Sequence, residues 1–452
     1  MTGGTGGEGR SAGASVAGDA LDELRRARRR FVVLTGLRWL PVGVAVPVMV
    51  LLMRERGLDL ATVGLLGAVY SAVTVTLELP TGGLADVVGR RPVLVVSSVL
   101  SIVAVAGVAL GTSALALGGA YALWGVSRAL DSGPLQAWYV DQVHAVDLDA
   151  DLKPGLARAG VAESSGLGIG ALAGGALVAV SPLPTTGAPL IALSTPFLLA
   201  ALLGVAHLVF LLAWVHDPPR ARRATLRDVL RDVPATVAHG ASLAVRHTVL
   251  RRIVGFMLAF GVALAAIELL APNAFAQMLG GESRAAAPYA VLVTLGFFGS
   301  AAGSSLAPLV ARLAGRSSRG VLITAVLSAG ALAAIGVPVI GVAAAAFVLF
   351  YLFLGMGGPL LDELTHRSVG PRERATMLSV NSMALQVGGV VASLAIGALA
   401  GATSLAVGLV VAAAVLVVGA GAMIGLRAPA QRSAGDPASS SSRTSLGPET
   451  SR

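Results

Sequence analysis

Two long stretches without a formal charge constrain this chain of 452 residues more than any other feature. They run from residue 320 to residue 361 and from residue 375 to residue 426. A helix needs about 20 apolar residues to cross the hydrocarbon core of a bilayer, so each stretch can hold two crossings. Because 55% of all residues are hydrophobic and only 13% are charged, a soluble fold would have too little polar surface to cover them. The sequence therefore predicts an all-α membrane protein.

Other apolar runs raise the expected number of membrane-spanning helices to twelve, in two bundles of six. We expect the helices at roughly residues 31–53, 61–84, 92–111, 115–138, 157–180, 189–214, 253–279, 287–311, 320–340, 341–361, 376–399 and 402–426. The chain then divides into a basic disordered tail, a first bundle, a polar linker, a second bundle and a disordered tail, at residues 1–30, 31–214, 215–252, 253–426 and 427–452. An amphipathic stretch of the linker, residues 224–245, is expected to lie along the membrane surface.

The distribution of Lys and Arg predicts which side of the membrane each loop faces. Positive charge favours the cytoplasmic side of short loops. With the N-terminus inside, 28 of the 33 Lys and Arg residues fall on cytoplasmic segments, so both termini are expected in the cytoplasm. Lys occurs once and Arg 32 times, which is typical of GC-rich coding. We therefore expect a protein of a bacterial cytoplasmic (inner) membrane.

A dense group of Gly and charged residues separates the second and third expected spans. It reads Gly82-x-Leu84-Ala85-Asp86-x-x-Gly89-Arg90-Arg91, and it resembles the signature loop of the major facilitator superfamily. The resemblance covers about residues 31–426 and implies a secondary transporter that works by alternating access of two six-helix bundles. It also implies a conformational lock with the end of the fourth span, formed by Gly82, Asp86, Gly89, Arg90, Arg91 and Asp141.

A weak second copy of this loop occurs later in the chain. A shift of 226 residues places Gly89 and Arg90 on Gly315 and Arg316. Both pairs lie between the second and third helices of an expected bundle, which favours a duplicated unit.

Charged residues inside the expected spans are candidates for proton coupling, since a charge in the hydrocarbon region is costly unless it is paired or functional. Arg128 and Asp131 share one helix face, in a segment that resembles the fourth-helix motif of the superfamily. An arginine beside a carboxylate favours the charged form, and its withdrawal favours protonation. Arg38 and Glu78 lie at matching depths, so Arg38 could pair with Glu78 or with Asp131. The alternatives to coupling are a structural Arg38–Glu78 pair and a self-contained Arg128–Asp131 pair.

Glu268, in the seventh expected span, has no basic residue near it in the sequence. It is therefore the best isolated carboxylate for binding a proton or a cationic substrate. The other interpretation is a neutral acid that is hydrogen-bonded between helices. Glu268, Trp124 and Arg38 are the candidate lining residues of a substrate cavity.

Small residues recur along one face of the fifth expected span, at Gly166, Gly170, Gly174 and Gly175. Such a face permits close approach of another helix. The run resembles the antiporter signature of the drug and proton exchangers of the superfamily, in which Pro stands at the position of Ala171. Because this chain has Ala171 instead of that Pro, close helix packing and an export-specific role are both open as interpretations of the glycine face.

Several absences exclude other classes of protein. The sequence has no phosphate-binding Gly-x-x-x-x-Gly-Lys-Ser/Thr loop, no His-Glu-x-x-His pair and no cysteine. We therefore expect no enzyme, no metal site and no cofactor, with a proton gradient as the energy source. Basic residues fall between apolar spans rather than on one soluble face, so nucleic acid is not an expected partner.

The combined features predict a monomeric, proton-coupled exporter of small lipophilic or cationic compounds, resembling the bacterial drug-efflux members of the superfamily. Its expected partners are a small-molecule substrate, protons and the lipid bilayer. One alternative is an importer, proton-coupled or facilitated, of a sugar or other metabolite. Another, from a different class, is a membrane receptor or scaffold that transports nothing.

Overall fold

The computed structural model describes residues 8–148, 150–217, 242, 247–369 and 374–426, which are almost entirely helical. The helices before the linker are α1 (Glu8–Glu55), α2 (Leu60–Val88), α3 (Arg90–Leu110), α4 (Ala114–Asp131), α5 (Pro134–His144), α6 (Lys153–Ala179) and α7 (Thr195–Trp214), with a short 3-10 helix η1 (Ala192–Ser194) ahead of α7. Those after the linker are α9 (Thr248–Leu279), α10 (Glu282–Ala314), α11 (Ser317–Ala334), α12 (Ile340–Ser368), α13 (Arg374–Ala402) and α14 (Leu405–Gly421).

Ten helices in the described part of the chain are long and apolar enough to cross a membrane. Three further α-helices of the described chain, α4, α5 and α14, fall outside that group, and α5 has only 11 residues. α14 has only 17 residues, and α4 carries Gly, Ser, Arg and Asp residues that lower its mean hydropathy. The multi-pass helical fold is therefore confirmed, whereas the count of twelve spans and the side on which the termini lie stay predictions.

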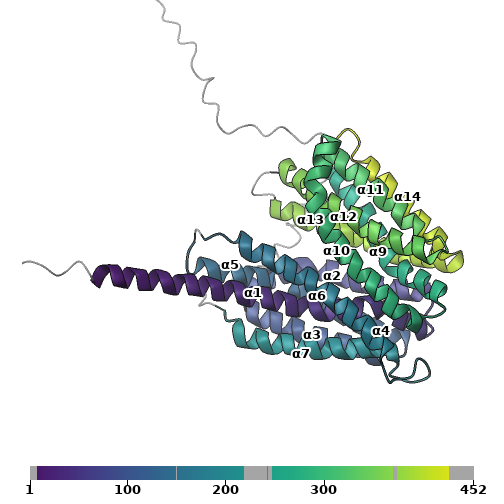
Figure 1. The fold of residues 1–452 in the computed structure, drawn as a ribbon, viewed down its shortest axis with the longest axis horizontal. Coiled ribbons are helices and arrows are strands. Elements are labelled where there is room, and N and C mark those ends of the chain that lie inside the picture. Colours follow the sequence, from purple (N-terminus) through teal and green to yellow (C-terminus); the bar gives the residue numbers. More distant parts are fainter. Residues whose placement is uncertain (1–7, 149, 218–241, 243–246, 370–373, 427–452) are drawn as a thin grey trace, which may run out of the picture.

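The helices form two groups that the linker separates in sequence (Figure 1). α1 to α7 pack against one another, chiefly through α1 with α6, α3 with α4 and α2 with α4. α9 to α14 pack likewise, through α10 with α12, α9 with α13 and α11 with α12. Between the groups, α2 lies against α13, α6 against α10, and α1 against α9 and α10.

Several close contacts between the two groups lie toward one end of the helices. A Cβ added at Gly64 on α2 would meet the backbone of Ser393 on α13. Thr294 on α10 donates a hydrogen bond of 3.0 Å to the carbonyl of Gly168 on α6. These positions lie in the halves of the helices that the charge distribution assigns to the outer side. At the opposite end, α5 packs on α1, α3 and α4 of its own group.

The N-terminal segment differs from the expectation of a disordered tail at residues 1–30. α1 begins at Glu8, so residues 8–30 are helical. Ala, Leu, Glu and Arg are strong helix formers, and Arg25 pairs with Asp22 one turn earlier at 3.3 Å. The tail at 427–452 lies outside the described residues, as does the amphipathic stretch 224–245 apart from residue 242.

The fourth expected span, residues 115–138, is interrupted in the structure. α4 ends at Asp131, α5 begins at Pro134, and Gly133 between them has a φ of +101°. Proline suits the first position of a helix but cannot continue a preceding one, and glycine adopts positive φ without steric cost. The interruption leaves Asp131 at the C-terminal end of α4.

The loop expected at residues 82–91 is confined to one residue. α2 continues to Val88 and α3 begins at Arg90, so Gly89 alone breaks the helix, with a φ of +117°. Gly315, between α10 and α11, also has a positive φ, at +71°. The same break in the same place of each group supports the duplicated unit.

Candidate functional site

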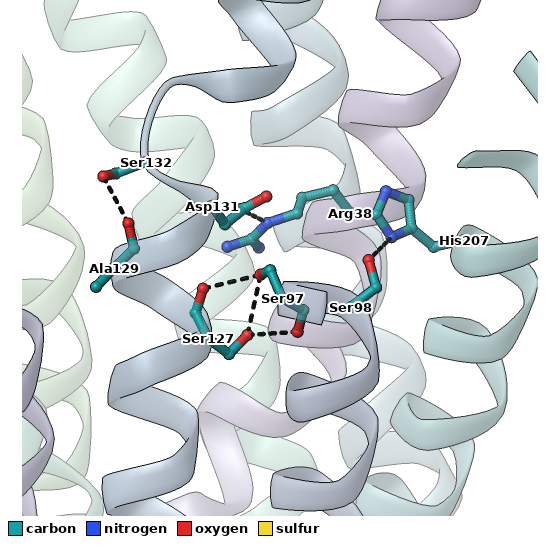
Figure 2. A network of polar contacts seen from close by, with 8 residues as sticks. All are labelled: Arg38, Ser97, Ser98, Ser127, Ala129, Asp131, Ser132 and His207. Carbon is teal, nitrogen blue, oxygen red and sulfur yellow. Dashed lines mark hydrogen bonds and ion pairs between the residues drawn. The ribbon is translucent and has the colours of Figure 1, made fainter. Parts of the chain in front are cut away.

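A polar network inside the first group joins α1, α3, α4 and α7 (Figure 2). Arg38 on α1 forms an ion pair with Asp131 at the end of α4, from Nε to Oδ2. Only 15% of the Arg38 side chain and 11% of the Asp131 side chain are exposed. Of the two partners that the sequence left open for Arg38, the structure places Asp131 beside it.

A second arginine joins this network through Trp39. The guanidinium carbons of Arg38 and Arg128 lie 4.8 Å and 5.8 Å from the centre of a Trp39 ring, within the range of cation–π attraction. Glu163 on α6 lies close enough to interact electrostatically with both arginines. Among the described residues, Arg128 and Asp131 form no ion pair with each other. Two cations and two anions therefore share this region, which offsets the cost of burying them.

Glu78 takes part in a contact between the two groups instead. Nε2 of Gln386 on α13 donates a hydrogen bond of 3.0 Å to Oε2 of Glu78 on α2. The structural Arg38–Glu78 pair is therefore wrong. Matching depth places two side chains in one layer of the membrane, but it does not decide which helix faces meet.

Glu268 lies in the interior of α9, 11 residues before its end at Leu279, which is about 16 Å at 1.5 Å per residue. Its side chain is exposed, although the residues on either side of it are buried. It interacts electrostatically with Tyr70 on α2, Tyr289 on α10 and Tyr351 on α12. Because these tyrosines come from both groups, Glu268 faces the space between them. No ion pair of Glu268 occurs among the described residues.

Trp124, the aromatic candidate for contact with a substrate, is only 8% exposed. Its ring packs edge-on against Tyr70 and Tyr121, with ring centres 6.1 Å and 6.2 Å apart. The Trp124 side chain is therefore largely covered by the protein. A substrate contact by Trp124 itself stays a prediction.

The residues expected to form the conformational lock meet at the start of α3. Arg90 forms an ion pair with Asp141 on α5. Oδ1 of Asp217 accepts hydrogen bonds from the backbone amides of Arg90 and Arg91, at 3.1 Å each, and so caps the N-terminus of α3. The other members, Gly82 and Asp86, lie on α2, and their surroundings are outside the described set. A locking role stays a prediction.

The glycine face of α6 packs closely on two neighbouring helices. A Cβ added at Gly166, Gly170 or Gly174 would meet the backbone of α1, and one at Gly175 would meet Ala290 on α10. The face thus joins α6 to its own bundle and to the other one. Of the two interpretations, the structure shows close helix packing by this glycine face. An export-specific role stays a prediction.

The comparisons with known proteins agree with this architecture. Residues 31–393 match the family model described as the Major Facilitator Superfamily. The chain belongs to this superfamily. The resemblance carried by residues 82–91 is therefore confirmed at that level, and the protein is a membrane transporter rather than an enzyme. The drug-efflux subtype stays a prediction.

Solved structures of several transporters have a similar fold. The nucleoside transporter NupG matches with a TM-score of 0.71 and 13% identity, over 88% of this chain and 98% of its own. A bacterial homolog of the human lysosomal transporter Spinster, inward-facing and occupied, matches with a TM-score of 0.67 and 14% identity, over 88% and 95%. The human organic anion transporter MFSD10 (TETRAN) matches with a TM-score of 0.60 and 17% identity, over 88% and 99%. At these identities the likeness shows the fold alone. No curated protein matches the sequence.

The candidates from the sequence did not include Glu163 and His207, which lie near the Arg38–Asp131 pair, or Gln386, which contacts Glu78. Glu163 lies 10 residues after the start of α6 at Lys153, which is about 15 Å along the helix. His207 could have been found, because it is the only histidine inside an expected span. Gln386 carries no charge and had no signal in the sequence.

Proposed function

We propose that this transporter exports small lipophilic cations in exchange for protons, by alternating access of its two bundles. The observation that carries the proposal is the placement of Glu268. Its carboxylate is exposed in the interior of α9, faces both bundles and has no basic partner among the described ion pairs. A carboxylate in this position can hold a proton or a cation, but it does not hold both, so loading one releases the other.

The surroundings of Glu268 suit a cation with apolar substituents. Tyr70, Tyr289 and Tyr351, which lie on three helices, interact with it electrostatically. The faces of aromatic rings attract cations, and the same rings provide apolar contact area. A sugar would need many hydrogen-bond partners, and each hydroxyl left unpaired would cost about 1–3 kcal/mol. This argues for a lipophilic cation over a sugar.

The contacts between the bundles fit one state of an alternating-access cycle. The Gly64–Ser393 approach and the Thr294–Gly168 hydrogen bond lie in the halves of the helices assigned to the outer side, whereas the Gln386–Glu78 hydrogen bond lies nearer the other end. With both termini in the cytoplasm, this arrangement corresponds to a transporter that is closed outside. Reopening that side would require α2 to part from α13 and α6 from α10.

Transport in proteoliposomes tests the proposal. An internal pH dye would report proton movement after addition of lipophilic cations, organic anions, nucleosides or sugars. We expect only lipophilic cations to drive protons in the opposite direction. Glu268→Gln should reduce this movement at least about tenfold, because a charge-assisted contact is worth roughly 1.5–3 kcal/mol. The matched control is Glu23→Gln, since Glu23 is an exposed glutamate on the same chain.

The possible results separate the proposal from its alternatives. If a sugar or nucleoside moves protons in its own direction, the chain is an importer and the export hypothesis is wrong. If Glu268→Gln behaves as Glu23→Gln does while cations are still exchanged, Glu268 is not the shared site. If no solute of the panel shows counterflow, the receptor or scaffold alternative gains support.

A further inference from the structure

A concentrated positive charge lies on α1 just before the first expected span, which begins at Phe31. α1 has 48 residues, so it is about 72 Å long at 1.5 Å per residue, whereas the hydrocarbon core of a bilayer is about 30 Å thick. Its N-terminal part projects beyond the other helices of its group (Figure 1). Residues 21–30 carry five arginines and two acids, and the arginines fill every position from 25 to 30 except Ala27.

This part of α1 is held against its bundle. Ala27 and Phe31 are buried, and Leu24 packs against the same cluster of residues as Phe31. The Phe31 ring stacks on Tyr139 of α5 with ring centres 4.4 Å apart, and Tyr139 also lies against Gly155 of α6. The backbone that carries the five arginines is therefore fixed relative to α5 and α6. Three of their side chains are exposed, at positions 25, 26 and 29.

α6 brings two further cations to the same level. α1 and α6 run in the same direction, because Gly36, Leu40 and Val44 each lie close to α6 residues 126 and 130 positions later in the chain. Residues of the two helices that are about 128 positions apart therefore lie level with each other. Lys153 and Arg158, which are both exposed, are then level with the first and the last arginine of the run on α1.

Most of the positive charge of this surface is not balanced by acids. Of the seven cations, Arg25 alone forms an ion pair among the described residues, with Asp22 at 3.3 Å. Asp151 accepts a hydrogen bond of 3.0 Å from the backbone amide of Lys153. Like charges gathered at one level repel one another, and an anion between them relieves the repulsion. The surface is therefore complementary to an anionic partner.

The level of this surface along α1 identifies the anion as lipid phosphate. The cluster around Phe31 contains Trp138 and Tyr139, and Trp214 packs against it. Trp and Tyr concentrate at the boundary between the hydrocarbon core and the headgroups. The arginines lie directly beyond that boundary, and positions 25 to 30 span a rise of about 7.5 Å. The headgroup layer on each side of a bilayer is about 5–8 Å thick, so the arginines and the lipid phosphates share one layer.

We propose that the arginines at 25–30 of α1, together with Lys153 and Arg158 of α6, form a binding surface for anionic phospholipid. A guanidinium donates two parallel hydrogen bonds to a phosphate, so arginine suits this contact better than lysine. The bound headgroups screen the repulsion between the cations and fasten α1 to α6. Arg38 lies eight residues beyond the run, about 12 Å further along α1, so the lipid steadies the helix that carries the Arg38–Asp131 pair. The inference does not depend on which solute is transported.

Fluorescence anisotropy of phosphatidylglycerol with a labelled acyl chain, added to the full chain in detergent, tests the inference. We expect unlabelled phosphatidylglycerol to displace the probe, and zwitterionic phosphatidylcholine and soluble glycerol 3-phosphate not to displace it. Arg26→Gln/Arg29→Gln/Arg158→Gln should weaken binding roughly 100-fold, because each basic residue near an anionic lipid surface contributes about fivefold. The same three positions changed to Lys keep the charge and should retain most of the binding.

The matched control is Arg312→Gln/Arg316→Gln/Arg319→Gln, which removes three exposed arginines from the ends of α10 and α11 and should leave binding nearly unchanged. Equal losses in the two triple Gln variants, or displacement by phosphatidylcholine or glycerol 3-phosphate, overturn the proposal. Salt provides a test on the unmodified protein if the first variant does not fold. Raising the ionic strength from about 0.1 M to 1 M shortens the Debye length from about 10 Å to 3 Å, so the preference for phosphatidylglycerol should largely vanish. A preference that survives this change also overturns the proposal.

Discussion

Replacing Arg38 by Gln should destabilise the protein far more than breaking an exposed ion pair. The substitution leaves Asp131 inside the bundle without its cation, and removing one partner of a buried pair costs about 3–5 kcal/mol. The exposed fractions decide the comparison: 15% and 11% for Arg38 and Asp131, but 70% and 65% for Arg25 and Asp22. Breaking the exposed pair should cost about 0–1 kcal/mol.

Thermal unfolding of the detergent-solubilised protein measures this difference. At about 2 °C per kcal/mol for a large chain, Arg38→Gln should lower the midpoint by about 6–10 °C. Asp22→Asn should lower it by no more than about 2 °C. Arg38→Gln/Asp131→Asn should recover most of the loss, because neither charge is then left alone.

Asp22→Asn is the matched control for this measurement, because it breaks an ion pair between the same two residue types at an exposed position. A loss in Arg38→Gln equal to that in Asp22→Asn would refute the reasoning, since the pair would then contribute nothing beyond a solvated one.

Three further predictions concern stability, each measured by the midpoint of thermal unfolding. Arg56→Ala should lower the free energy of unfolding by at least about 3 kcal/mol, because the Arg56 guanidinium donates hydrogen bonds to several carbonyls at the end of α3 and in the loop before α7. The control Arg54→Ala removes one hydrogen bond, so equal losses of stability in the two variants would contradict this prediction. At the start of α2, the backbone amide of Thr62 donates a hydrogen bond to the Asp59 carboxylate and lowers the pKa of that carboxyl group. Asp59→Ala should therefore destabilise the protein at neutral pH. The difference in stability between the variant and the unmodified protein should vanish as the pH falls through that lowered pKa. Gly174→Leu should separate α6 from α1 and cost about 1–3 kcal/mol or more, whereas Gly160→Ala, at a position with open space, should be tolerated.

The helical architecture could be predicted because hydrophobicity along the chain determines where the bilayer can be crossed. Each expected span overlaps chiefly one helix, except that the fourth is divided between α4 and α5, and α1 begins 23 residues before the first span. The departures have local causes. The break at Gly133 depends on a Gly–Pro step inside an otherwise apolar run. The helix at residues 8–30 depends on propensity, which composition rich in Gly and Ser obscured.

The site was harder to predict, because periodicity gives the depth of a residue and not its neighbour. Arg38, Asp131 and Glu268 were named from the cost of charge in a membrane, which is visible in one sequence. The choice of Asp131 rather than Glu78 as the partner of Arg38 depends on how α1 packs against α4 and α2. Gln386 carries no such cost, so its contact with Glu78 was not predictable from the sequence.

The two acidic centres lie in different bundles, and the aromatic residues between them explain how one could influence the other. Tyr70 on α2 interacts electrostatically with Arg38, Arg128 and Asp131 as well as with Glu268. A change of charge at either centre is therefore felt at the same tyrosine, on the helix that packs against α13 of the other bundle. Coupling between a proton site and a substrate site needs an element that both sites bias. For the proton and substrate sites that we propose, α2 is the candidate for such an element, because it carries Tyr70 and accepts, at Glu78, a hydrogen bond from Gln386 of the second bundle.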